Sequence, residues 1–577
     1  MEMLNELKKI WAEIVAKKIG LPSQEVFSYF EVPKKPEMGD IALPCFKLAK
    51  LLGEDVKSFA EKLKDTLSGA YMVGRAEVVG GYLNLRIERG PFAQKLLERV
   101  LKEGENYGSS DEGKGKTVLI DFSSPNIAKP FGVGHLRSTV LGAALGRIFR
   151  FLGYRVVGIN YLGDWGAQVA KMMVAYEKWF DKTNKQEDTI KKLYELYVKF
   201  HKEEETDTTL STEADEILKS LENHEQQALK LWREFVEISM TEFRRIYEIL
   251  GVTFDVFAGE SMCDDTGQPR CIEKMDAVIE DLSKKNLLKK GEGGALIVEF
   301  DEKEKIPPLM MRKSDGTTLY ATREVAVALE RWNKEHFDKM LYVVGAPQKL
   351  HFQQVFRLFE MANYPFAGRC EHIAFGHYLG MSTRRGTMVL LEELLNELIQ
   401  KAQKVIEEKN PELLKVEDPY NVAKDVAVGA LVFNDLKNER IKDVLYDEER
   451  FLSFDGETGP YLQYAHTRLC GILRKWGKGV PKDFNASLLS SDEEWRLITH
   501  LAKFGEIVKS AEESREPSRI AGYLIECASD LNLFYQRHRV LGEDENLTKA
   551  RIVLVSALRS VLATGLKLLG IRPLERM

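Results

Sequence analysis

The sequence predicts an α/β chain in three parts: a small N-terminal α+β domain, a central α/β domain on a parallel sheet with helical insertions, and a C-terminal all-α helical bundle. Three patterns lead to this prediction. A strand–helix–strand unit spans residues 116–161, a long charged helical stretch covers residues 172–250, and amphipathic helical segments succeed one another after residue 400. With 577 residues, 44% of them hydrophobic, the chain is large enough for several cores.

The N-terminal region, residues 1–112, contains helical segments, a stretch rich in Pro and Gly (VPKKPEMGDIALP) and two strand-like runs, the second ending in GGYLNLRI. The polar link GSSDEGKGK separates it from the next strand. The first helix, MEMLNELKKIWAEIVAKKIG, has mixed charge and lacks the apolar core of a signal peptide. No apolar run is long enough to span a bilayer, so we expect a cytoplasmic protein that does not bind membranes.

The central domain begins with a short β-branched strand, Lys116–Phe122 (KTVLIDF), and continues into a helix from about His135 to a stop at Gly153. A second strand-like run follows at Arg155–Tyr161 (RVVGINY). This unit is a crossover of the kind that joins parallel strands. Because ligands of such sheets bind outside the carboxyl ends of the strands, the loop after Phe122 is the predicted site.

That loop carries hydroxyl, amide and ammonium groups, and then two glycines and a histidine where the helix begins. These residues are Ser123, Ser124, Asn126, Lys129, Gly132, Gly134 and His135. A helix N-terminus favours anions, and glycine lets backbone approach a ligand closely, so the loop predicts a triphosphate site. The alternative is a tight turn with no ligand.

The glycine spacing in GVGHLR matches neither a dinucleotide fingerprint nor a GxxxxGK[ST] phosphate loop. It resembles the HIGH signature of class I aminoacyl-tRNA synthetases, and SPNIAKPFGVGHLRST resembles the arginyl-tRNA synthetase version. Further motifs follow in that family's order: NYLGDWGAQ, MRKSDGTTLYATREVA, YVVGAPQKLHFQQVF, GMSTRRGT, GPYLQYAHTR and the terminal LGIRPLERM.

This resemblance to arginyl-tRNA synthetases implies a class I Rossmann-like catalytic domain at residues 113–400, an N-terminal domain at 1–112 that grips the tRNA elbow, and a helical anticodon-binding domain at 401–577. It implies an arginine-tRNA ligase that activates L-arginine with ATP and transfers it to the 3′-terminal adenosine of tRNA(Arg). The expected cofactor is ATP with Mg²⁺, which the enzyme uses as a substrate. The partners are then tRNA(Arg), L-arginine and ATP, with no DNA, and the protein is expected to be a monomer.

A second cluster of polar residues follows in LYATREVA and YVVGAPQ. Tyr320 and Glu324 are four residues apart on a helical turn and so share a face, and Gln348 follows an apolar strand. A guanidinium presents a fixed fork of donors, which carboxylates and other acceptors can receive. The alternative for Glu324 is an exposed helix charge paired with Arg323 or Arg331.

The resemblance implies that these residues bind the substrate arginine together with several groups of the first loop. The full set is Asp121, Ser124, Asn126, His135, Tyr320, Glu324 and Gln348. In the family the acid on the helix is typically Asp, whereas this chain has Glu324 there. The acid before SSPN is often Glu in the family, whereas this chain has Asp121. Charge is preserved, while the geometry differs.

The loop GMSTRRGT stands where class I enzymes carry KMSKS, which holds the triphosphate and neutralises charge on pyrophosphate. The functional lysine of that motif is absent here, and Lys129 matches the lysine that replaces it in many family members. The implied catalytic residues are Lys129, His135, Arg384 and Arg385, and the implied ATP-binding residues are Gly132, Gly134, His135, Met381 and Ser382. The alternative for the two arginines is a basic surface loop.

One position departs sharply from the family. The usual HxGH reads Gly132-Val133-Gly134-His135 here, so the first histidine is missing. Losing one preorganised donor costs a few kcal/mol at most, about the contribution of one oxyanion-hole group. The alternative functions are therefore a catalytically silent synthetase-like module that binds tRNA or protein and, less favoured, an unrelated nucleotidyltransferase.

Two insertions interrupt the central domain. Residues 172–250 are charged and helical, with solvated faces, and we place them between the two halves of the sheet, where they recruit tRNA or brace the site. Residues 257–311 combine a helix, CIEKMDAVIEDLSKKNLL, with a strand-like run, ALIVEF.

The C-terminal region is predicted to be all helical, with short polar loops. Aromatic and basic residues there are candidates for stacking on unpaired RNA bases and for phosphate contact, although some are structural. The tRNA-binding candidates are Asn84, Tyr461, Tyr464, Arg468, Tyr535 and Met577, with His466, Arg537 and Arg539 as further candidates. The resemblance also implies that the C-terminal residues, here Arg576 and Met577, close against the bundle. The net charge of −6 requires the basic groups that contact tRNA to be concentrated on one face.

The six cysteines form no CxxC pair. The sequence therefore predicts no zinc site, no disulfide framework and no protein-bound metal. It also predicts that the protein resides in a reducing compartment.

Overall fold

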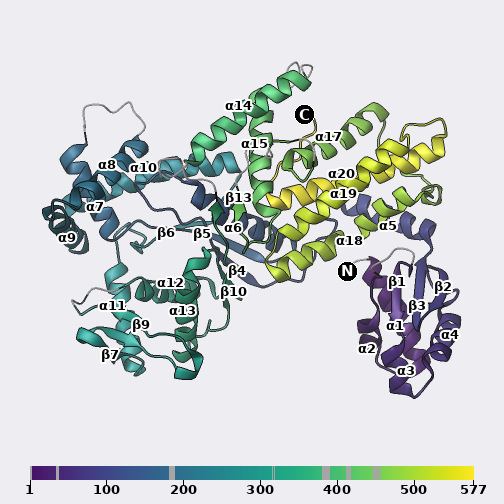
Figure 1. Cartoon of the computed structure of the whole chain (residues 1–577), viewed down its shortest axis with the longest axis horizontal. Helices are drawn as coiled ribbons and strands as arrows, with labels where there is room; N and C mark the ends of the chain where they lie inside the picture. Colours follow the sequence, from purple (N-terminus) through teal and green to yellow (C-terminus); the bar gives the residue numbers. More distant parts are fainter. Residues whose placement is uncertain are drawn as a thin grey trace.

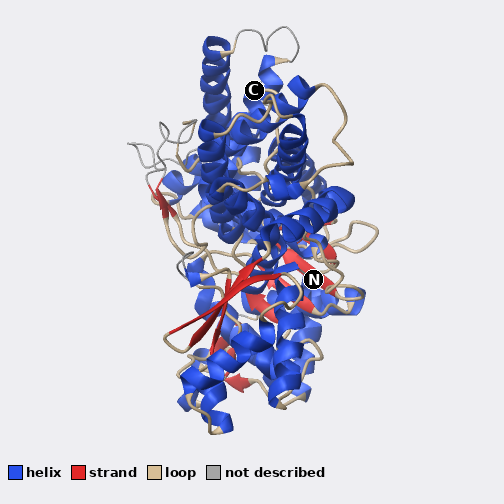
Figure 2. Cartoon of the chain, turned by 90° about the vertical axis from the view of Figure 1, so that its right-hand side faces the viewer, coloured by secondary structure: helices blue, strands red, loops and turns tan. Residues whose placement is uncertain are grey.

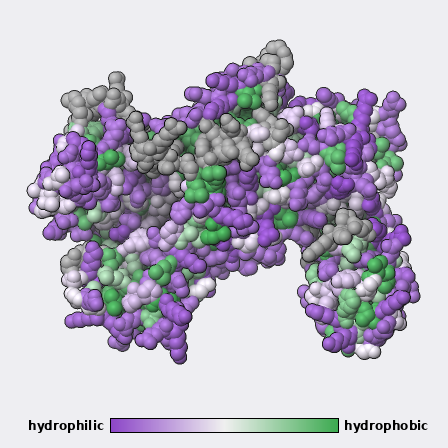
Figure 3. Space-filling model, in the orientation of Figure 1, coloured by the Kyte–Doolittle hydropathy of each residue, from purple (hydrophilic) through white to green (hydrophobic). Residues whose placement is uncertain are grey.

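The computed structural model describes residues 3–33, 38–180, 189–314, 316, 319–379, 390–410, 418–445, 452–453 and 456–577. The N-terminal domain lies to one side of the molecule, the central domain occupies the middle and the other side, and the C-terminal helices lie above both (Figure 1). In the space-filling view a deep notch separates the N-terminal domain from the lobe that carries α11 to α13 (Figure 3).

The N-terminal domain packs four helices on a small antiparallel sheet of order β1-β3-β2, whose strands are drawn as long red arrows in Figure 2. The strands are β1 (Ile41–Pro44), β2 (Val73–Val79) and β3 (Tyr82–Ile87), and the helices are α1 (Met3–Ile19), α2 (Ser23–Tyr29), α3 (Phe46–Leu52) and α4 (Val56–Leu67). Helix α1 is amphipathic and buries Leu7, Trp11 and Val15 at helical spacing. The predicted α+β domain is confirmed.

The central sheet has five parallel strands in the order β11-β10-β4-β5-β6. They are β4 (Thr117–Asp121), β5 (Arg155–Leu162), β6 (Val256–Gly259), β10 (Lys339–Tyr342) and β11 (Cys370–His372). The chain moves outward from β4 through β5 to β6 and then crosses back to β10 on the other side of β4. The switch point lies between β4 and β10, where ligands of doubly wound sheets bind.

Helices cover both faces of this sheet. Helix α6 (Val133–Phe151) packs on one face so closely that a Cβ on Gly142 would lie 2.3 Å from the Phe122 ring. The other face belongs to a core that also contains α12 (Tyr320–Glu335) and α13 (Lys349–Met361). The strand–helix–strand unit is therefore confirmed, and Asp121 ends the central strand.

The first insertion is helical, as predicted, and consists of α7 (Ala167–Trp179), α8 (Thr189–Glu204), α9 (Thr209–Glu222) and α10 (Gln226–Leu250). Its predicted place between the two halves of the sheet is wrong. It connects β5 to β6, which are neighbours in the first half. The sequence analysis missed β6 because this strand is only four residues long.

The second insertion does separate the two halves, since it lies between β6 and β10. It contains α11 (Cys271–Lys284) and an antiparallel sheet of β7 (Lys289–Lys290), β8 (Leu296–Val298) and β9 (Leu309–Arg312). The predicted start at residue 257 falls inside β6, so the insertion begins after Gly259.

The C-terminal bundle consists of α14 (Leu391–Lys409), α15 (Pro419–Leu436), α17 (Gly459–Trp476), α18 (Asp492–Ser514), α19 (Ser518–Arg537) and α20 (Glu545–Leu569). The predicted domain boundary at residues 400 and 401 falls within α14. One short strand departs from the all-helical prediction, because β13 (Val444–Leu445) pairs with β12 (Tyr378–Leu379) of the central domain.

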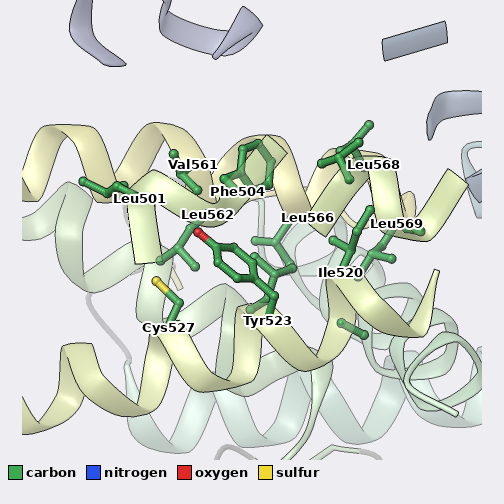
Figure 4. Close-up of a cluster of buried hydrophobic side chains, with 14 of the residues drawn as sticks. Leu501, Phe504, Ile520, Tyr523, Cys527, Val561, Leu562, Leu566, Leu568 and Leu569 are labelled. Carbon is green, nitrogen blue, oxygen red and sulfur yellow. The ribbon is translucent and has the colours of Figure 1, made fainter. Parts of the chain in front are cut away.

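Helix α20 is the core of the bundle. Among the described residues it is the one helix long and apolar enough to cross a bilayer, but 83% of that window is buried in the protein. Its Leu562 and Leu566 lie against side chains of α18 and α19 (Figure 4). Burial on several sides explains why this helix is apolar all round.

Helix α5 (Arg89–Glu103), followed by the 3-10 turn η2 (Gly104–Asn106), joins the N-terminal domain to the rest. It packs on α18 and α20, and Gln94 Oε1 accepts a hydrogen bond from the Ala486 backbone at 2.9 Å. The link is therefore fixed against the bundle over the length of a helix.

Candidate active site

The loop after β4 has an unusual backbone. Ser123, Ser124 and Ala128 all have left-handed φ angles, of 75°, 49° and 57°. Such conformations cost roughly 1–3 kcal/mol each in non-glycine residues and persist only where the surroundings enforce them. Ser138 of α6 supplies part of that restraint, since its hydroxyl accepts from Ser123 N at 2.9 Å and donates to the Val343 carbonyl at 2.7 Å. The hydroxyl thus bridges the loops after β4 and β10.

Helix α10 of the first insertion supplies the rest of the restraint. Ser239 accepts a hydrogen bond from Ala128 N at 2.8 Å, and the Tyr247 hydroxyl lies 2.7 Å from Ser123 Oγ. Asn160 of β5 donates to the same tyrosine at 2.8 Å. Ser239 and Tyr247 are two turns apart and therefore lie on one face of the helix. Of the two roles considered for this insertion, the structure supports bracing.

Glu324 lies in the second turn of α12 and is 5% exposed. Tyr320, at the start of the same helix, donates a hydrogen bond to its carboxylate. Burial raises the pKa of Glu324 to about 7, while the positive charge of Arg331 acts in the opposite direction. The alternative of an exposed helix charge is therefore wrong.

Asp121, at the end of β4, is neutralised by the protein itself. Arg331 Nη2 lies 2.6 Å from its carboxylate, and both side chains are less than a tenth exposed. Ser124 Oγ donates to the other carboxylate oxygen at 3.1 Å. Among the described residues Glu324 forms no ion pair, because Arg331 binds Asp121 and Arg323 binds Glu260 at 2.7 Å. Glu324 is therefore the carboxylate available to a cationic ligand, and Asp121 supports the site from behind.

The remaining predicted arginine-binding groups surround the switch point. Asn126 is exposed and pairs with Gly163, where a Cβ would lie 1.9 Å from Asn126 Oδ1, so a larger residue there would displace the Asn126 amide. Gln348 is exposed at the end of the turn η5 (Ala346–Gln348) that follows β10. The structure thus brings both loops to the same edge of the sheet.

The predicted phosphate-binding groups begin α6. His135 lies in its first turn, and burial lowers the pKa of this imidazole, which is therefore neutral at pH 7. Its Nδ1 is buried without a partner among the described residues. Gly134 is exposed, and a Cβ there would meet nothing within 4 Å, so open space lies over the helix N-terminus. Lys129 Nζ lies 3.9 Å from the centroid of the Tyr197 ring.

Gly132 is the N-cap of α6, with φ −85° and ψ 160°, a conformation open to any residue. It forms a β-bridge with Leu390, and Leu391 N donates to the Phe131 carbonyl at 3.0 Å. The segment that follows the second predicted phosphate loop is thus hydrogen-bonded to the first predicted phosphate loop. Four predicted residues of that second loop, Met381, Ser382, Arg384 and Arg385, lie outside the described residues.

Sequence reasoning missed His351 of α13. Its ring lies 4.8 Å from the Tyr320 ring, and burial together with His372 lowers its pKa to about 4. The side chain is therefore neutral, and its ring packs against the ring of Tyr320. The sequence offered one indication of this residue, since His351 lies three residues after Gln348, in the helix that follows that loop.

Comparison with known protein families accounts for most of the chain. Residues 96–448 match the family model "tRNA synthetases class I (R), catalytic domain", residues 462–577 match "DALR anticodon binding domain", and residues 5–87 match "Arginyl tRNA synthetase N terminal domain". The chain belongs to the arginyl-tRNA synthetase family.

Curated relatives agree over their full length. The arginine–tRNA ligase of Alkaliphilus metalliredigens (strain QYMF) is 42% identical over 579 residues, covering 100% of both chains. That of Clostridium beijerinckii is 43% identical over 571 residues, covering 98% of this chain and 99% of its own. Among solved structures, the arginyl-tRNA synthetase of Thermus thermophilus has a TM-score of 0.81 at 27% identity, covering 99% of each chain.

Four of the predicted tRNA-binding residues of this arginyl-tRNA synthetase family member lie together in the bundle. The Arg468 guanidinium lies 4.8 Å from the Tyr464 ring centroid and 4.9 Å from that of Tyr535, and its Nη1 donates to Asn532 at 2.5 Å. Asn532 in turn donates to the Tyr461 hydroxyl at 2.8 Å. Tyr464 and Tyr535 are 40% and 44% exposed, so two aromatic faces and a cation meet solvent here.

Other RNA-binding candidates have structural roles. His466 is 2% exposed, and its Nδ1 lies 2.9 Å from the Leu574 carbonyl. Arg537 forms an ion pair with Glu493 at 2.6 Å. The Met577 carbonyl accepts from Asn410, the C-cap of α14, at 2.7 Å, so the C-terminus closes against the bundle as predicted. In the N-terminal domain Asn84 is only 7% exposed, which leaves little of its side chain for a ligand.

Proposed function

We propose that this protein is an arginine–tRNA ligase, which activates L-arginine with ATP and transfers it to tRNA(Arg). The carboxylate of arginine attacks the α-phosphate of Mg-ATP, which gives arginyl-adenylate and releases pyrophosphate. The terminal adenosine 2′-hydroxyl of tRNA then attacks the acyl carbon, and AMP leaves. Since the substrate supplies the nucleophile, no serine or cysteine nucleophile is needed. The family and the full-length relatives favour this function over the silent module.

The observation that carries the proposal is the buried Glu324 carboxylate beside Tyr320. A carboxylate without an ion-pair partner among the described residues is costly to bury, and its raised pKa records that cost. A guanidinium that enters the site removes the penalty and makes charge-assisted hydrogen bonds. A neutral side chain of similar length gains neither. The site therefore selects arginine by charge as well as by shape.

The other residues divide between the two substrates. Ser124, Asn126 and Gln348 place arginine at the carboxyl ends of β4 and β10. Gly132, Gly134 and His135 cradle ATP at the N-terminus of α6, together with Met381 and Ser382 from the second loop. Lys129, Arg384 and Arg385 are cations that stabilise the charge developing on pyrophosphate, a contribution that is large in a water-poor site.

Mg²⁺ enters bound to ATP. Across the parts of the chain that the structure describes, no group of three or more His, Cys, Asp or Glu side chains could hold a metal ion. We propose a cytoplasmic monomer that binds tRNA through Tyr461, Tyr464, Arg468 and Tyr535, and that binds neither DNA nor membrane.

A charging assay tests this function. Purified protein is incubated with tRNA(Arg) and radiolabelled arginine, with and without ATP, and in parallel with labelled lysine and glutamine. We expect ATP-dependent incorporation of arginine alone. No arginine charging at saturating ATP and cognate tRNA would refute the proposal, and tRNA binding without charging would identify the silent module instead.

A further inference from the structure

The Lys129 ammonium lies over the face of an aromatic ring that belongs to the first insertion. Lys129 Nζ is 3.9 Å from the ring centroid of Tyr197, which lies in the middle of α8. The Tyr197 hydroxyl donates to Gln168 Oε1 at 2.7 Å, near the start of α7. The ring is therefore held from its far end by the motif that follows β5.

A ring and a carboxylate differ in what they do to a lysine. A carboxylate at this distance would neutralise the ammonium, whereas the π face attracts it and leaves its full positive charge. No carboxylate of a described residue forms an ion pair with Lys129. The contact restricts a side chain with four rotatable bonds while keeping its charge available to a phosphate.

The backbone beside Lys129 is held by the same insertion, because Ser239 of α10 binds Ala128 N at 2.8 Å. Two helices of the insertion thus fix the main chain and the side chain of adjacent loop residues. We propose that Tyr197 is a positioning residue for adenylation, whose ring places the Lys129 ammonium at the phosphate-binding loop. This inference rests on the proposed function and on the role of Lys129 within it.

The test compares Tyr197→Leu, which removes the ring, with Tyr197→Phe, which keeps the ring and loses only the hydrogen bond to Gln168. Arginine-dependent pyrophosphate exchange is measured with tRNA(Arg) present, with ATP and arginine varied separately. We expect Tyr197→Leu to lower kcat about threefold to tenfold, the range of one cation–π contact, and to raise KM for ATP. KM for arginine stays unchanged, and Tyr197→Phe keeps nearly the parental kcat.

Lys199→Ala is the matched control, because Lys199 of the same helix makes a contact of the same kind with Trp179, at 4.4 Å. It should leave both KM values and kcat at the parental level. Thermal unfolding of each variant excludes a general loss of structure.

A double-mutant cycle isolates the coupling. In the Lys129→Ala background, Tyr197→Leu should cause no further loss of kcat. Two outcomes would overturn the inference and leave the proposed function intact. One is that the two substitutions lower kcat additively. The other is that Tyr197→Leu keeps the parental kinetics while Lys129→Ala is impaired. Parental kinetics for Lys129→Ala would overturn the inference together with the assigned role of Lys129. Absence of exchange in the parent would instead refute the function itself.

Discussion

At the scale of residues, the site separates two carboxylates that the sequence suggested were equivalent. Asp121 is paired with Arg331 at 2.6 Å, and Glu324 keeps no such partner among the described residues. The family resemblance placed both near arginine, and helical spacing placed Tyr320 beside Glu324. Neither source revealed that Arg331 binds Asp121, because that pair joins β4 to α12 across 210 positions of sequence. Pairs of this kind depend on the tertiary fold.

Glu324 gives a prediction about stability. Its pKa is raised to about 7 in the folded state, from an ordinary value of 4.5, so the folded protein binds the extra proton between these values. Stability from this group is therefore lost as pH rises from 4.5 to 7. Glu324→Gln should raise the free energy of unfolding at pH 8 by roughly 1–3 kcal/mol and leave it unchanged at pH 4. Urea denaturation at both pH values measures this; equal stability of variant and parent at pH 8 would contradict it.

Gly132 gives a prediction about rate. Its backbone conformation accepts any residue, so the missing histidine of the family motif can be introduced there without backbone strain. We expect Gly132→His to raise kcat of pyrophosphate exchange by up to about tenfold, the contribution of one added donor to the phosphates. Gly132→Ala serves as the control and should not increase kcat. If the histidine variant is no faster than the alanine variant, the imidazole has no part in this enzyme's adenylation.

At the scale of elements, the first insertion holds the loop after β4 through hydrogen bonds from α10. Its helical content was predictable from periodicity and charge. Its contacts were not, because Ser239 and Tyr247 are unremarkable polar residues until the fold places them two turns apart against the loop. The short strand β6 was missed for a related reason, since four residues carry too little pattern to distinguish a strand from a loop.

Ser239→Ala tests the bracing role of α10. The change leaves the Ala128 amide buried without its acceptor, which should cost about 1–3 kcal/mol of stability and raise KM for ATP. Thr241→Ala is the matched control. Both hydroxyls donate to the carbonyl four residues earlier, Ser239 to Phe235 at 2.6 Å and Thr241 to Glu237 at 2.9 Å, but Thr241 is exposed. Chemical denaturation and ATP kinetics should separate the two variants, and equal behaviour would argue against bracing.

At the scale of the whole molecule, a buried group of polar side chains joins the catalytic domain to the bundle. Arg137 of α6 lies 3.6 Å from Asp435 of α15, and Tyr378 of β12 donates to Asp435 at 2.5 Å. Arg137 also donates to the Lys442 carbonyl at 2.6 Å. Burial raises the pKa of Asp435 to about 6, against the opposing charge of Arg137. The three-part organisation was predictable from sequence, but this junction was not, since its residues carry no local pattern.

Asp435→Ala should therefore leave Arg137 as an uncompensated buried charge and cost about 3–5 kcal/mol of stability. Arg137→Met combined with Asp435→Leu removes both charges and should recover most of that loss. Calorimetry measures both variants. If Asp435→Ala alone is as stable as the parent, the pair does not hold the domains together.

The most direct measurement of the central claim is arginine-dependent pyrophosphate exchange by Glu324→Gln, with tRNA(Arg) present and with ATP and arginine varied separately. Because glutamine keeps the size and loses the charge, we predict a fall in kcat/KM for arginine of about a hundredfold or more, corresponding to roughly 3 kcal/mol, with KM for ATP unchanged. Parental kcat/KM for arginine in Glu324→Gln would contradict the account.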